Sequence, residues 1–129
     1  MEINIPVSVG ELLDKLSIVE IKIKNISDKQ KLDYLNKEFE LLTNKAAEIK
    51  KIDSGQYANF YSSLLSINSD LWDIEDEIRE LENKKSFDED FIAAARAVYI
   101  TNDERFNIKT QINTFFGSSI VEQKELKKY

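Results

Sequence analysis

Polar side chains interrupt two helical stripes that would otherwise be apolar, and they are the residues best suited to chemistry in this chain. In both stripes the members recur every three or four residues, as they do on one face of a helix. The polar members, in chain order, are Asn68, Trp72, Glu75, Arg79, Asn102, Arg105 and Lys109. An unpaired charge inside a protein costs on the order of several kcal/mol. These groups therefore either neutralise one another or surround a ligand.

The charged members of the two stripes do not balance. One carboxylate stands against three cations, so two further carboxylates, or one dianionic ligand, are needed for neutrality. Glu11 and Glu20 are the protein candidates for that role. Glu75 and Arg79 are one turn apart and can pair along their helix. We predict that Arg105 lies inside the bundle with a carboxylate partner, for which Glu75 is the first candidate.

The residue types exclude several kinds of chemistry. The chain has no Cys and no His, so disulfides, zinc sites and catalysis by thiol or imidazole are absent. Any reaction would use carboxylates, Lys, Arg, Tyr or an oxygen-ligated metal. The acidic residues between 70 and 82 fall mostly on an outer helical face and are interpreted as solvated. No cofactor, metal site or catalytic residue is assigned.

Composition favours one soluble, all-α domain over residues 1–129. Hydrophobic residues make up 42% and charged residues 33%, and three Gly and one Pro leave few turns for a sheet. A net charge of −6 argues against a nucleic-acid surface. No apolar run approaches the ~20 residues of a membrane span, and no secretory signal is recognisable at the start. The expected location is cytoplasmic.

Hydrophobic periodicity and capping residues predict an elongated antiparallel bundle of four main helices. The predicted helices span residues 8–26, 28–52, 57–83 and 87–116. Ser8 and Glu11 form a capping box at the first start, and the apolar phase slips near Ser27. Gly117 suits the end of the last helix. Residues 1–7 are predicted as a short extended arm, and residues 118–129 as a short terminal helix or a tail.

Unequal helix lengths predict self-association. The first helix is too short to cover the last two, which leaves an overhang for a second subunit. Ile3, Ile5 and Val7 lie on an arm with little core to join. We therefore expect a homodimer with two-fold symmetry.

Several segments resemble a family of small bacterial and phage proteins that is catalogued as a domain of unknown function. The segments are 6–16, 71–79, 95–103 and 108–118, which together sample nearly the whole chain. Its polar signature falls on Glu11, Lys15, Asn68, Trp72, Glu75, Arg79, Arg96, Asn102, Arg105 and Lys109. The resemblance implies these ten as candidate ligand-binding residues. It implies no activity, because the family has none established.

Two functions fit these patterns. The favoured one is a non-catalytic binding or assembly module, in which the Arg, Lys, Glu and Asn side chains fix helix register and hold a small anionic ligand. The alternative is a small cofactor-free enzyme acting on an anionic phosphate or carboxylate metabolite in the bundle core. One deep pocket containing Arg79, Arg105 and Lys109 would favour the enzyme, and a dry pairwise network the module. Trp72 fits either core packing or a stacking platform.

Overall fold

A computed structural model describes residues 1–129 and contains four α-helices and no strands. The helices are α1 (Val9–Asn25), α2 (Lys29–Lys50), α3 (Ser54–Asn83) and α4 (Glu89–Phe115). Together they hold 74% of the residues. The prediction of an all-α protein with four main helices is confirmed. None of the four combines the length and hydrophobicity that crossing a bilayer requires.

Side-chain caps set the helix starts. Ser8 Oγ accepts a hydrogen bond from the Glu11 backbone N–H at 3.1 Å, so the Ser8 half of the predicted capping box is confirmed, whereas the Glu11 carboxylate pairs with Lys109 instead. Helix α3 begins at Ser54 rather than at residue 57, because the Asp53 carboxylate accepts from the Gln56 N–H at 3.0 Å. From sequence alone, a stretch rich in Asp, Ser and Gly predicts a loop, but the same residues also cap helices.

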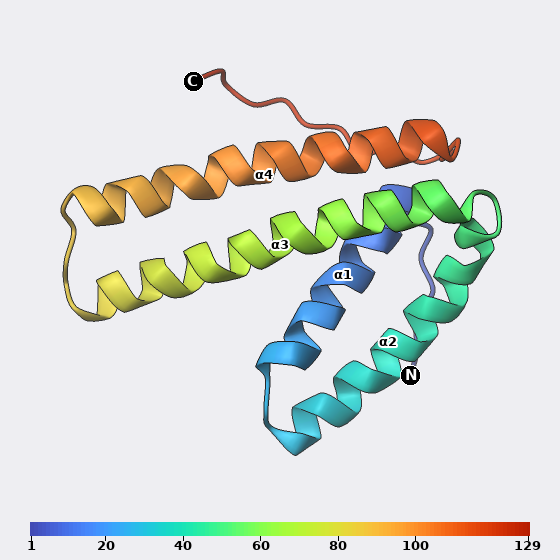
Figure 1. Cartoon of the computed structure of the whole chain (residues 1–129), viewed down its shortest axis with the longest axis horizontal. Helices are drawn as coiled ribbons and strands as arrows, with labels where there is room; N and C mark the ends of the chain where they lie inside the picture. The colour runs from blue at the N-terminus through green and yellow to red at the C-terminus, as the bar shows by residue number, and fades with distance from the viewer.

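A Gly-based turn ends α4 and releases the chain as a tail. Gly117 has a φ of +64°, and the Ser118 N–H donates to the Asn113 carbonyl oxygen at 2.8 Å. This pattern satisfies carbonyls that the helix end leaves free. Residues 118–129 form no helix, so of the two alternatives the tail is correct. The tail runs beside α4, and the Tyr129 hydroxyl donates to Asp103 Oδ2 at 2.7 Å (Figure 1).

The helices form two antiparallel hairpins that diverge from one another. Figure 1 shows α3 and α4 side by side, with the α1–α2 hairpin leaving them at an angle. Helix α1 packs against all three other helices, whereas α2 makes no contact with α4. The outer halves of α3 and α4 extend beyond α1 as the sequence predicts. The bundle is therefore closed only where α1 meets α3 and α4.

The hydrophobic core lies at that crossing. Its buried members are Leu13, Leu16, Ala46, Leu64, Ile67 and Ile112. Leu13, Leu64 and Ile112 are fully buried and come from three different helices. Only Ala46 of α2 is buried, because α2 contacts little besides α1. The core fixes the middle of α3 and the carboxyl-terminal half of α4 relative to α1.

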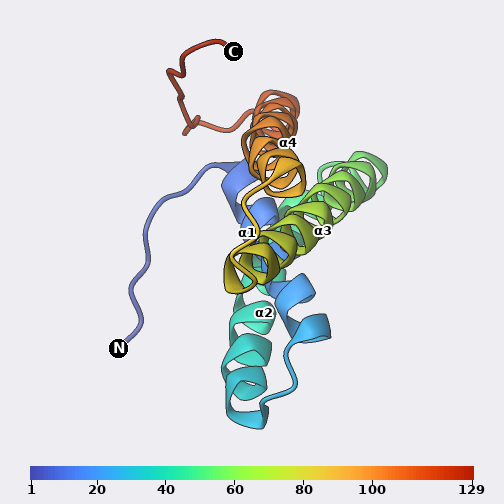
Figure 2. The same ribbon diagram turned by 90° about the vertical axis from the view of Figure 1, so that its left-hand side faces the viewer.

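The first seven residues form no helix or strand and are exposed. Ile3 and Ile5 of this arm are more than two-thirds exposed. Figure 2 shows the arm leaving the start of α1 and projecting away from the helices. The arm therefore brings apolar side chains to the surface without joining the core.

Two stacked tyrosines on α3 lie close to α1. The rings of Tyr57 and Tyr61 are 5.9 Å apart and nearly parallel. Burial raises the pKa of both phenols above the usual 10.0, and the negative charge of Glu20 on α1 adds to the rise. Both side chains are therefore held in the neutral form.

These phenols make the fold sensitive to alkaline pH. Unfolded tyrosines ionise near pH 10, whereas the native state keeps its protons to higher pH. Stability is thus fully present below about pH 10 and falls as the pH rises above it. We expect urea titrations of a variant with both Tyr57→Phe and Tyr61→Phe to show a shallower alkaline decline. Tyr34→Phe, at a 70% exposed position, is the control and should leave the decline unchanged.

Candidate functional site

Asp14 of α1 is the centre of a buried polar network. Its side chain is 1% exposed and accepts hydrogen bonds from Arg105 Nε at 2.9 Å and from Arg105 Nη2. Asn68 Nδ2 donates to Asp14 Oδ1 at 2.9 Å. Arg105 is thus paired, as predicted, but the predicted partner Glu75 is wrong. Glu75 is exposed, while the buried α1 carboxylate lies directly between α3 and α4.

Lys109 of α4 extends the network toward the tail. Its ammonium is buried and lies 2.7 Å from Glu11 Oε2, 3.2 Å from Glu122 Oε1 and 3.8 Å from Asp14 Oδ2. With Arg105, two cations therefore face three carboxylates. Glu11 takes the neutralising role expected of it, whereas Glu20 lies beside the stacked tyrosines instead. The buried charges of the network are neutralised by the protein itself.

Both cations are held in the charged form. The pKa of Arg105 is raised because its guanidinium hydrogen-bonds Asp14, which outweighs the effect of burial. Burial lowers the pKa of Lys109, but its hydrogen bond to Glu11 and the charge of Asp14 produce a net rise. Neither group has a tendency to release a proton near neutral pH, so neither is suited to general acid or base work.

The start of α1 docks closely on the end of α4. The Gly10 N–H donates to Asn113 Oδ1 at 2.7 Å, and the Val9 N–H donates to Ser118 Oγ at 3.1 Å. A Cβ on Gly10 would lie only 2.7 Å from the Lys109 carbonyl oxygen. The first N–H groups of α1 are thus occupied by protein side chains, and this contact sets the register that brings Asp14 opposite Arg105.

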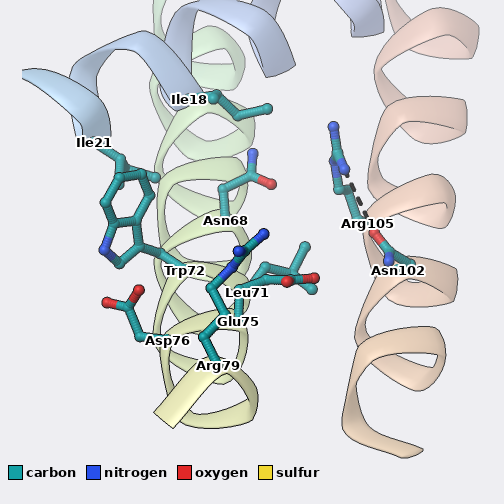
Figure 3. Close-up of a pocket in the computed structure, with 10 residues that line it drawn as sticks. All are labelled: Ile18, Ile21, Asn68, Leu71, Trp72, Glu75, Asp76, Arg79, Asn102 and Arg105. Atoms are coloured by element: carbon teal, nitrogen blue, oxygen red, sulfur yellow. Dashed lines mark hydrogen bonds between the residues drawn. The ribbon is translucent and has the colours of Figure 1, made fainter. Parts of the chain in front are cut away.

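An open groove of about 470 Å³ lies beside this network, between the end of α1 and the middles of α3 and α4 (Figure 3). Its lining residues are Ile18, Ile21, Asn68, Leu71, Trp72, Glu75, Asp76, Arg79, Asn102 and Arg105. We call it the α3–α4 groove. Six of the ten predicted candidates line it, although they come from two helices that are far apart in sequence. The two polar stripes therefore meet at one surface.

Most charged groups of the α3–α4 groove form no ion pair. Arg79 is exposed and forms no ion pair, so the expected pairing with Glu75 one turn away is absent. Arg105 uses Nε and Nη2 for Asp14, and only its Nη1 turns to Asn102 Oδ1, at 3.4 Å. Trp72 is half-buried at the α1 side of the groove.

A second, smaller recess of about 220 Å³ lies on the other side of Arg105. It is lined by Glu11, Asn102, Arg105, Phe106, Lys109, Glu122 and Lys124. Its only apolar lining residue, Phe106, has the Lys124 ammonium 5.0 Å from its ring centre. Asn102 and Arg105 line both hollows, but Lys109 and Arg79 do not share one. The tail supplies two of the groups that close this recess.

Comparison of the sequence with known families gives a match that spans nearly the whole chain. The family of unknown function DUF6165 matches residues 1–128. The chain belongs to that family. No curated protein and no solved structure matches it. The match covers every residue that lines either hollow and leaves out only Tyr129.

Two predicted site residues lie outside both hollows. Lys15 is exposed on α1 and sits 3.7 Å from Glu38 of α2 in a surface ion pair. Arg96 is exposed on the outer half of α4. Family resemblance marked both positions, but the structure does not bring either to the other eight.

Sequence reasoning missed Asp14, Ser17, Asn113 and Glu122. The signal for Asp14 was a second face of α1, at steps of four, three and four: Gly10, Asp14, Ser17 and Ile21, all of which are buried. The stronger leucine seam next to it hid that face. Glu122 had no periodic signal, because its segment is not helical. The structure holds no group of three or more acidic residues placed to bind a metal ion.

Proposed function

We propose that this protein is a non-catalytic binding module whose α3–α4 groove holds a small anionic ligand. The observation that carries the proposal is Arg79, a guanidinium with no carboxylate partner that lines the same groove as Nη1 of Arg105. Guanidinium groups bind carboxylates and phosphates through paired, charge-assisted hydrogen bonds. The half-buried Trp72 adds an apolar surface beside them.

The buried network and the groove have different roles in this proposal. Arg105, Lys109, Asp14 and Glu11 satisfy one another at short distances and need no ligand. Arg105 is already balanced by Asp14, so the charges left in the groove are the Arg79 guanidinium and the carboxylates of Glu75 and Asp76. One free cation among carboxylates favours a small anion bound at one position over adsorption of a highly charged polymer.

The enzyme alternative is less well supported by this geometry. It requires Arg79, Arg105 and Lys109 around one pocket, but Lys109 lines the second recess and is held between carboxylates. Neither cation of the network is disposed to donate or accept a proton near neutral pH. A groove that fixes an anion beside paired, inert cations suits binding.

The single tryptophan makes the proposal directly testable. Trp72 lines the groove and is the only Trp in the chain, so a bound ligand should change its fluorescence. Phosphates, sugar nucleotides and dicarboxylates are titrated at low ionic strength, with thermal shift as the second readout. A saturable fluorescence change with one of these classes is expected. No saturable response from any of them at millimolar concentrations would refute the proposal.

Arg79→Gln tests the residue that carries the proposal. The change removes the unpaired guanidinium, so binding of the responding anion should weaken at least about tenfold. Stability should stay within about 0.5 kcal/mol of the parent, since Arg79 is exposed and unpaired. Arg96→Gln is the matched control on the neighbouring helix, outside the groove, and should leave affinity unchanged. Equal affinities of both variants and the parent would remove Arg79 from the site.

We also infer that two chains associate. The outer halves of α3 and α4 run beyond α1. Phe87 in the connection between them and Ile92 and Tyr99 on α4 are exposed there, while the arm exposes Ile3 and Ile5. These exposed apolar side chains are available for contact with a second chain. Light scattering should give about twice the chain mass of 15.0 kDa. A single-chain mass at high protein concentration would contradict the association.

A further inference from the structure

The hydrogen bonds around Asn68 fix which way its amide faces. Its Nδ2 donates to Asp14 Oδ1 and to Ser17 Oγ, both at 2.9 Å. The Ser17 hydroxyl has already given its own hydrogen to the Asp14 carbonyl oxygen at 2.7 Å, so toward Asn68 it acts as the acceptor. Both neighbours therefore require the nitrogen of Asn68 on their side. The amide cannot be turned over without losing two buried hydrogen bonds.

This orientation leaves an acceptor facing the α3–α4 groove. Asn68 is 5% exposed, yet its Oδ1 accepts no hydrogen bond from any protein group. Figure 3 shows the oxygen directed toward the α4 side of the groove, where Arg105 and Asn102 lie. This oxygen is the part of Asn68 that stays open to water in the groove, so a bound ligand that covers it must supply a hydrogen-bond donor in place of the water.

Asn102, across the groove, has its oxygen bonded and its amide nitrogen free, the reverse of Asn68. Its Oδ1 accepts the contact from Arg105 Nη1 at 3.4 Å, while its Nδ2 donates to no protein group. The groove thus holds one free acceptor on α3, one free donor on α4 and the unpaired guanidinium of Arg79. A ligand that satisfies all three groups carries hydrogen-bonding groups as well as a negative charge.

We propose that the groove is selective for anions that also carry a hydroxyl or amino hydrogen-bond donor, with Asn68 Oδ1 as the group that recognises the donor. This deepens the proposed function and rests on it. The anionic group binds at Arg79 and Nη1 of Arg105, and the donor reaches Asn68 from the same ligand. Hydroxy acids, amino acids and sugar phosphates have this chemistry.

The selectivity follows from the position of Asn68. A ligand that fills the groove excludes water from the Asn68 oxygen, so a ligand without a donor leaves that oxygen unpaired. Sites that provide a hydrogen-bonding group discriminate strongly against the analogue that lacks its partner. The fixed amide strengthens the effect, since the side chain cannot rotate to offer its nitrogen instead. An affinity difference of about tenfold or more is expected.

Two pairs of small anions test the inference on the unmodified protein. Malate has one hydroxyl more than succinate. Glycerol 3-phosphate has two hydroxyls more than propyl phosphate. Affinity is measured from Trp72 fluorescence. We expect the hydroxylated member of at least one pair to bind about tenfold tighter. Equal binding within both pairs would overturn the inference and leave the anion site standing. No binding by any of the four would also overturn the inference, while the anion site itself is refuted only if the phosphates, sugar nucleotides and dicarboxylates all fail.

Asn68→Leu then assigns the selectivity to this residue. The variant has no acceptor, so the affinity ratio within the discriminating pair should fall to about one, whatever happens to the absolute affinities. Asn59→Leu, an exposed position on the same helix, is the matched control and should keep the parent ratio. A folded Asn68→Leu protein that still prefers the hydroxylated anion would overturn the role of Asn68. If the variant does not fold, the ligand pairs on the parent protein decide the selectivity.

Discussion

Replacing Arg105 with Met is expected to lower the free energy of unfolding by about 3–5 kcal/mol. Met keeps much of the volume of the side chain but removes the charge. Asp14, which is 1% exposed, then loses the partner that binds both of its oxygens. Lys109, at 3.8 Å, is already shared with Glu11 and Glu122 and replaces Arg105 only in part. Urea denaturation followed by circular dichroism measures the change.

A double-mutant cycle distinguishes the lost pair from lost packing. Asp14→Leu alone should destabilise the fold by a similar amount, because Arg105 then becomes the uncompensated charge. The double variant with Asp14→Leu and Arg105→Met should recover much of the loss, as buried ion pairs replaced by apolar groups of similar size often do. Arg96→Met is the control at an exposed position and should change stability by less than about 0.5 kcal/mol.

Arg105→Met also separates the structural role of Arg105 from a role in ligand binding alone. If Arg105 served only to attract a ligand, its removal would relieve repulsion with Lys109 and leave the free protein as stable or more so. The short distances from Arg105 to Asp14 predict instead that the free protein loses stability. A stability equal to or above that of the parent would contradict the ion-pair network described here.

The sequence predicted the positions of the polar groups better than their partners. Periodicity placed Asn68, Arg105 and Lys109 on inward faces, and all three lie in the buried network. It could not identify Asp14, since the partner depends on how far α1 slides along α4. That register is set by the close approach at Gly10, a contact between residues about 100 positions apart.

The same stripe on α3 changes its environment along its length. Asn68 is buried, whereas Glu75 and Arg79 are exposed. The pattern is helical throughout, but α1 covers only the first part of the stripe because the hairpins diverge and α1 ends at Asn25. Periodicity reports which residues share a face and gives no information on where the covering helix ends. The groove lies at that boundary, where polar groups pass from buried to open.

Gly10→Ala should destabilise the protein by about 2–3 kcal/mol, although Ala is the better helix former. A methyl group at this position would lie 2.7 Å from the Lys109 carbonyl oxygen and 3.1 Å from its Cα. Both are backbone atoms of α4, so no side-chain rotation relieves the contact. Helix α1 would have to move away, which stretches the 2.7 Å hydrogen bond from the Gly10 N–H to Asn113.

Gly55→Ala provides a matched control for this prediction. Gly55 is the second residue of α3 as Gly10 is of α1, but a methyl group there meets only Asp53 Oδ1 at an ordinary 3.6 Å. The gain in helix propensity is unopposed, so Gly55→Ala should be neutral or stabilise by up to about 1 kcal/mol. The two substitutions must therefore differ in sign or in size by about 2 kcal/mol or more. Similar effects at both glycines would mean that α1 and α4 do not dock at Gly10, and the register that pairs Asp14 with Arg105 would lose its physical basis.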